Sequence, residues 1–122
     1  MLRAAQIFAG LSGALAVALG AWAAHGLEAR FGVRAAELVR LGSQYQLVHA
    51  LALLAALALA GQGAGRRAAR VAAGGFMLGS VLFCGALYAL AFGLPRGFGA
   101  VAPLGGLAFI AGWLALAFCA RR

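Results

Sequence analysis

The stretch QYQLVHAL, residues 44–51, places two glutamines, a tyrosine and a histidine at the start of a long apolar run. An imidazole can bind a metal ion or carry a proton, whereas phenol and amide groups donate and accept hydrogen bonds. Tyr45 and His49 are four residues apart and Gln46 and His49 are three apart, so a helix would bring all three side chains to one face. The stretch therefore predicts a polar face on an otherwise apolar helix.

Catalysis needs more groups than this face supplies. No Asp or Glu lies within residues 4–27, 41–65, 71–95 or 97–120, so no carboxylate in these apolar runs can orient an imidazole. Ser80 has no neighbours in the sequence that resemble a nucleophile–base pair. We therefore predict no catalytic residue, no metal ligand set and no cofactor.

The overall composition is that of a membrane protein. Only 10% of the 122 residues are charged and 66% are hydrophobic, whereas soluble domains carry about 25% charged residues. The mean hydropathy is +1.00. The four charge-free runs named above contain 24, 25, 25 and 24 residues, and each exceeds the roughly 20 residues that cross the hydrocarbon core.

In lipid, α-helices and closed β-barrels satisfy their own backbone hydrogen bonds, and the alternating pattern of a barrel is absent. The sequence therefore predicts an all-α integral membrane protein. It consists of a single domain, residues 1–122, with a four-transmembrane-helix bundle. The helices are expected at about residues 4–26, 42–61, 71–94 and 101–120.

Between the first two helices, residues 28–40 are polar on one helical side and apolar on the other. Arg30, Arg34 and Glu37 share the polar side, whereas the other side carries Leu27, Phe31 and Leu38. This pattern predicts a short amphipathic helix lying in the membrane interface, with a solvated linker as the alternative.

Small residues recur at helical spacing on three of the four predicted helices. In lipid, such residues let helix backbones approach closely, so they favour a tight bundle and a homo-oligomer. Whether these faces meet within one chain or between copies stays open. The residues concerned are Gly10, Gly13, Ala14, Ala21 and Ala24 in the first helix, Gly75 and Gly79 in the third, and Ala108 and Gly112 in the fourth.

Trp113 is expected deep in the fourth helix, where its indole N–H requires an acceptor. Cys84 and Cys119 are expected to be small apolar packing residues.

The net charge of +8 does not indicate a nucleic-acid partner, because the arginines occur only in the predicted loops and tails. Six of them fall on one side of a four-span chain, at positions 3, 66, 67, 70, 121 and 122, and four on the other, at positions 30, 34, 40 and 96. By the positive-inside rule, this difference places both termini in the cytoplasm.

Three interpretations of the polar residues remain open. In the first, Gln46, His49 and Tyr88 form an interhelical hydrogen-bond network that holds the helices in register. In the second, they line a polar pocket in the outer half of the membrane, with Tyr45, Gln44 and His25 nearby, that binds or transports a small molecule or an ion. In the third, His25 and His49 bind a haem or a metal ion.

Four segments of the chain match a known family in order: HGL at 25–27, YQLVHALALL at 45–54, GSVLFCGALY at 79–88 and PLGGLAFIAGWLALA at 103–117. They resemble the small bacterial membrane proteins grouped as domain of unknown function 423, which are similar to the mitochondrial transmembrane protein 256. The resemblance implies a four-span protein of the bacterial inner membrane and supplies no activity. The family commonly has a serine at position 84 and a glycine at position 23, where this chain has Cys84 and Ala23.

The leading functional hypothesis is thus a small membrane protein of structural or accessory role that associates with itself in the lipid bilayer. The alternative is a binding or transport module for an unidentified small ligand, and the redox or metal protein is the third and only enzyme-like hypothesis. A membrane-protein partner is a further alternative to the small ligand.

Overall fold

The computed structural model describes residues 2–62 and 65–120, and within these ranges every regular element is helical. Four segments are long and apolar enough to cross a membrane: one each at α1 and α3, one through α4, η1 and α5, and one through η2 and α6. The predicted four-span all-α architecture is confirmed. The elements in chain order are α1 (Leu2–His25), α2 (Leu27–Phe31), α3 (Val33–Gly61), α4 (Arg66–Gly79), the π-helix η1 (Ser80–Cys84), α5 (Gly85–Ala91), the 3-10 helix η2 (Arg96–Ala100) and α6 (Ala102–Phe118).

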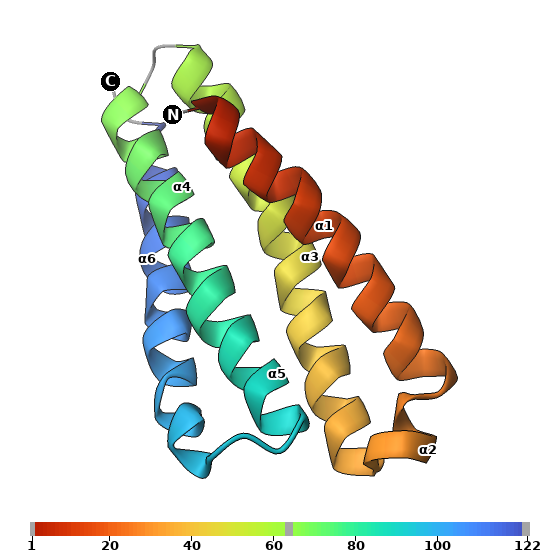
Figure 1. The fold of residues 1–122 in the computed structure, drawn as a ribbon. Helices are drawn as coiled ribbons and strands as arrows, with labels where there is room; N and C mark the ends of the chain where they lie inside the picture. Colours follow the sequence, from red (N-terminus) through yellow and green to blue (C-terminus); the bar gives the residue numbers. More distant parts are fainter. Residues whose placement is uncertain (1, 63–64, 121–122) are drawn as a thin grey trace.

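The helices form two pairs, and the pairs meet where α3 packs on α4 (Figure 1). α1 packs along α3 in one pair, and α6 packs along α4 and η1 in the other. Both chain ends lie at the same end of the bundle, whereas α2 and η2 lie at the opposite end (Figure 1). This arrangement leaves α1 in contact mainly with α3.

The segment predicted as a separate interfacial helix is divided in the structure. Its first part forms the five-residue α2, and its second part forms the first turns of α3, which begins at Val33 rather than near residue 42. Gly32, with φ of 95°, interrupts the helix between the two parts, and a side chain would disfavour this conformation. Val39 in the first turns of α3 packs against Leu27, and both side chains are fully buried. These turns are therefore held by protein contacts, which explains why they do not form an independent amphipathic helix.

Arg40 strengthens this end of the bundle. Its Nη2 donates a hydrogen bond of 3.2 Å to the backbone oxygen of Ala23, in the last turn of α1. Carbonyl groups in the last turn of a helix have no partner within it and carry partial negative charge, so a guanidinium there both bonds and neutralises them.

Three of the glycines in the third and fourth spans lie where the two helices meet. A Cβ atom added to Gly75 would come within 2.8 Å of the backbone oxygen of Ala108, and one added to Gly112 would come within 2.8 Å of the Phe76 ring. Gly79 faces the ring of Phe109 in the same way. Close packing of α4 against α6 therefore depends on the absence of side chains at these positions.

The first helix behaves differently, because most of its predicted small-residue face points away from the bundle. Gly13 is half-buried against Ala50, but the remaining members are exposed. The face that packs on α3 instead consists of Ala5, Ala9, Ser12, Ala16 and Ala23.

Candidate functional site

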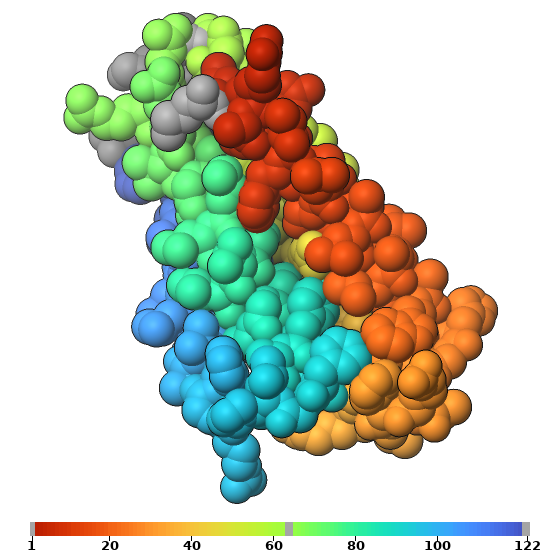
Figure 2. Space-filling model, in the orientation of Figure 1, coloured from red at the N-terminus to blue at the C-terminus, as the bar shows by residue number. Residues whose placement is uncertain are grey.

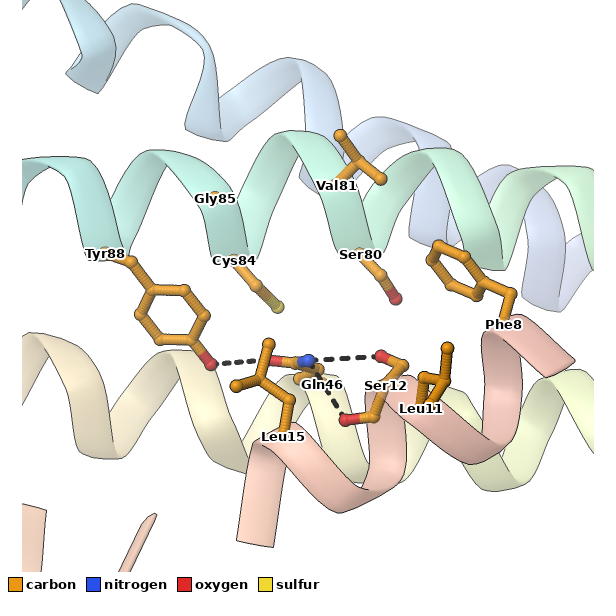
Figure 3. A pocket seen from close by; sticks show the side chains of 10 residues that line it. All are labelled: Phe8, Leu11, Ser12, Leu15, Gln46, Ser80, Val81, Cys84, Gly85 and Tyr88. Carbon is orange, nitrogen blue, oxygen red and sulfur yellow. Dashed lines mark hydrogen bonds between the residues drawn. The ribbon is translucent and has the colours of Figure 1, made fainter. Parts of the chain in front are cut away.

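Gln46 lies at the centre of a hydrogen-bond network that joins three helices (Figure 3). The Tyr88 hydroxyl on α5 donates to its Oε1 at 2.6 Å. Its Nε2 donates to the backbone oxygen and to the Oγ of Ser12 on α1, at 3.0 and 3.1 Å. Gln46 is buried, and its amide forms hydrogen bonds with protein groups instead of facing lipid, which offers no partners.

The imidazole of His49 is fixed by hydrogen bonds at both nitrogens. Trp113 Nε1 donates to Nε2 at 3.0 Å, and Nδ1 lies 2.6 Å from the backbone oxygen of Tyr45. An indole N–H can only donate and a carbonyl can only accept, so His49 must be the neutral tautomer with its proton on Nδ1. The ring of Phe109 stacks on this imidazole at a centroid distance of 3.6 Å, and Phe76 contacts it from α4.

These contacts bear directly on the metal hypothesis. A neutral imidazole binds a metal through an unprotonated nitrogen, and in His49 that nitrogen already accepts the hydrogen bond from the indole N–H of Trp113. His25 is exposed at the end of α1 and away from the rings that enclose His49. In residues 2–62 and 65–120 there is no group of three or more His, Cys, Asp or Glu side chains that could hold a metal ion. The structure therefore does not bring the two histidines into one site.

A lateral groove of about 420 Å³ opens beside the Gln46 network, between α1 on one side and η1 with α5 on the other. Figure 2 shows the hollow between these segments, with α3 behind it. Ten residues line the groove: Phe8, Leu11, Ser12 and Leu15 from α1, Gln46 from α3, Ser80, Val81 and Cys84 from η1, and Gly85 and Tyr88 from α5.

Ser80 contributes a hydroxyl group to this groove. Its side chain is only 8% exposed, and its oxygen points into the groove toward the α1 wall (Figure 3). Within the part of the chain that the structure describes, this hydroxyl has no hydrogen-bond partner, whereas Ser12 nearby is bonded to Gln46 Nε2. The oxygen borders the open groove rather than the closed interior, so it is available to a molecule in the groove.

The remaining predicted site residues lie outside this groove. Tyr45 is 42% exposed, and Gln44 is exposed beside it. Together with Val48 and the edge of His49, they line a separate surface hollow of about 300 Å³. In the second span, Gln46 and His49 thus point into the bundle, whereas Gln44 and Tyr45 point outward.

The depth of the network also differs from the sequence-based expectation. Gln46 is bonded to Ser12, the eleventh residue of the 24-residue α1, about 15 Å along the helix from its first residue. The network therefore lies near the middle of the bundle rather than in its outer half. Sequence reasoning overlooked Ser12, although it is the only hydroxyl-bearing residue within positions 4–27.

Comparison with known proteins gives a consistent result. The family model described as "Protein of unknown function (DUF423)" matches residues 19–106. A UPF0382 membrane protein of Haemophilus influenzae is 39% identical over 88% of this chain and 86% of its own length. The Bacillus subtilis UPF0382 membrane protein YwdK is 37% identical over 95% and 94%, and the Escherichia coli UPF0382 inner membrane protein YgdD is 42% identical over 88% and 81%. No solved structure matches the chain.

Proposed function

Given that the chain belongs to the DUF423 family of membrane proteins of unknown function, we propose that it is a binding protein that holds a neutral lipophilic molecule in the groove between α1 and α5. The molecule carries a carbonyl or hydroxyl group on an apolar body. This proposal favours the binding module over a purely structural role.

The unpaired hydroxyl of Ser80 is the observation that carries the proposal. Among the described residues no fully buried side-chain polar atom lacks a partner, so the Ser80 oxygen is accessible from the groove, and a hydrogen bond with a bound molecule would contribute about 0.5–1.5 kcal/mol. The groove volume of about 420 Å³ falls within the usual range for small-molecule sites, roughly 300–1,000 Å³.

The lining determines the chemical class of the ligand. The polar groups that face the groove are two hydroxyls, a phenol and an amide, and the rest of the lining is apolar or small. No charged side chain is among the ten lining residues, so nothing would compensate the desolvation of an ionised ligand. The Ser80 hydroxyl can both donate and accept, and Gln46 Oε1 keeps one lone pair free beside the bond from Tyr88.

A photoreactive probe tests this proposal in a membrane. A long-chain fatty alcohol that carries a diazirine is added to the protein in phosphatidylcholine nanodiscs, and the labelled peptides are mapped by mass spectrometry. We expect labelling to concentrate on residues 8–15 and 80–88.

Glycine substitutions supply the matched variants. A Cβ on Gly85 meets nothing within 4 Å, so a side chain can start there, and Gly85→Leu should occupy the groove and abolish this labelling. Gly106 on α6 is equally open but lies outside the groove, so Gly106→Leu should leave the labelling unchanged. Uniform labelling of all four spans that Gly85→Leu does not alter would refute the proposal.

We also propose that the chain lies in a bacterial inner membrane with both termini in the cytoplasm. The Escherichia coli relative is named as an inner membrane protein, which supports this location. Arg3, Arg66, Arg67 and Arg70 support the orientation, because they lie at the end of the bundle where both termini are found (Figure 1). Arg121 and Arg122, which the sequence pattern assigned to the same side, lie outside the described residues. A C-terminal alkaline phosphatase fusion should be inactive and a C-terminal green fluorescent protein fusion fluorescent, and the opposite result would reverse the orientation.

Self-association through α1 is a second candidate property. Gly10, Ala14, Ala21 and Ala24 form an outward-facing surface on which a second helix could pack closely. Ala14→Leu should reduce the dimer fraction in light scattering of the purified protein, whereas Ala111→Leu on the outer side of α6 should not. A monomeric wild-type protein would exclude this property.

A further inference from the structure

A second groove, of about 490 Å³, lies at the end of the bundle that carries the termini. It runs between the first turns of α1 and the stretch of α4 from Ala69 to Met77, with the end of α3 as its floor. Its lining is apolar or small apart from Arg70, and it shares only Phe8 with the groove described above.

Arg70 is the charged group of this groove. It is exposed, and among the described residues it has no hydrogen bond, ion pair or cation–π partner. A guanidinium remains charged in proteins, and its planar fork of N–H groups matches the oxygens of a phosphate. The acidic side chains of the protein, Glu28 and Glu37, lie in α2 and the first turns of α3, at the opposite end of the bundle, so neither can pair with Arg70.

The depth and shape of the groove match a lipid chain below that guanidinium. From Arg70 to Met77, the groove follows α4 for seven residues, about 10 Å along the helix axis toward the bundle centre. Gly74 lies between these two positions, and a Cβ there would meet nothing within 4 Å, which leaves the wall open. An apolar channel that descends from an arginine near the helix end fits an amphiphile with its anionic head at the surface.

We propose that this groove binds one acyl chain of an anionic phospholipid whose phosphate is held by Arg70. Basic sites between transmembrane helices are a recurrent way of recognising anionic lipid headgroups. The sites differ in chemistry, because the mid-bundle groove has no charged lining residue. The two proposals can therefore fail independently.

Competition between two lipids tests the inference. The full-length protein is extracted in mild detergent from vesicles that contain equal amounts of phosphatidylglycerol and phosphatidylcholine, and the retained lipids are quantified by native mass spectrometry. A single arginine near the membrane surface contributes about 1 kcal/mol, so the retained ratio should favour phosphatidylglycerol about fivefold.

Two variants separate local recognition from general surface charge. Arg70→Gln should bring the ratio close to one. Arg67→Gln removes the same charge from the same end of α4 but outside the groove, so it should keep the preference. Equal losses in both variants, or no loss in Arg70→Gln, would overturn the proposal.

A third variant tests the acyl-chain part. Gly74→Leu fills the groove and leaves Arg70 in place, so it should reduce retention of both lipids. Unchanged retention in Gly74→Leu would overturn the proposal, as would displacement of the lipid by millimolar glycerol phosphate, because a free anion would then be the ligand of Arg70. Thermal unfolding curves that match wild type establish that each variant is folded.

Discussion

His49→Phe isolates the hydrogen bond between His49 and Trp113. Phenylalanine keeps a planar ring that can stack on Phe109, which now lies 3.6 Å from the imidazole, but it removes the acceptor of the indole proton. Trp113 is 44% exposed on the outer surface of the bundle, where lipid chains offer no acceptor, so an unpaired indole N–H there costs about 1–3 kcal/mol, and interhelical hydrogen bonds in membranes contribute about 0.6–2 kcal/mol. We therefore expect His49→Phe to lower the free energy of unfolding by about 1–2 kcal/mol.

The partner substitution completes a double-mutant cycle. Trp113→Phe removes the donor, so the loss caused by His49→Phe should be smaller in the Trp113→Phe background by about 1 kcal/mol. His49→Ala also removes the ring that packs between Phe76 and Phe109, so it should lower the free energy of unfolding by about 3–5 kcal/mol. The measurement is a sodium dodecyl sulfate titration from mild-detergent micelles, followed by near-ultraviolet circular dichroism.

The tautomer offers an independent check. The ¹⁵N chemical shifts of His49 at neutral pH should be those of a neutral ring with its proton on Nδ1. If His49→Phe is as stable as wild type, shows no coupling to Trp113, and the ¹⁵N spectrum reports a proton on Nε2, the assigned network is wrong.

Three further substitutions test the packing. Gly75→Ala brings a methyl group against the α6 backbone and should lower the free energy of unfolding by about 1–3 kcal/mol, whereas Gly106→Ala should not, as the same detergent titration would show. Arg40→Gln removes the bond to the Ala23 carbonyl and should cost about 0.5–1 kcal/mol, with a larger loss at low ionic strength; a salt-independent effect would contradict the electrostatic part. The ring of Trp22 stacks on Phe92 at a centroid distance of 5.7 Å and meets Phe31 edge-on at 5.9 Å. Trp22→Ala should therefore lower the melting temperature more than Trp22→Phe does.

The four spans could be predicted because a bilayer requires about 20 consecutive apolar residues and the arginines mark the limits. The start of α3 could not, because Arg34, Glu37 and Arg40 suggested that the second span began only after them. A helix can continue past such charges when a neighbouring helix covers its apolar side, as α1 and α2 do for the first turns of α3. That cover is a tertiary contact and has no signature in hydropathy.

The site shows a similar division. Helical spacing placed Tyr45, Gln46 and His49 on one face, and two of the three are buried. The rotation of α3 against its neighbours turns Tyr45 outward, and a repeat of 3.6 residues per turn cannot specify that rotation. Trp113 was expected to need an acceptor, but only the assembled bundle shows that His49 provides it.

The π-helix Ser80–Cys84 makes the third span depend on chain length as well as composition. Bonds from i to i+5 accommodate one residue more than the ordinary ladder, which corresponds to about 100° of helical phase. That offset sets the angular relation of Ser80, the first residue of the bulge, to Tyr88 beyond it, and both reach the same groove. A homologue one residue shorter between positions 79 and 85 would be just as apolar and would still cross the membrane. Its tyrosine would be rotated away from Gln46, so aligned length across this interval distinguishes relatives that keep the network from those that have lost it.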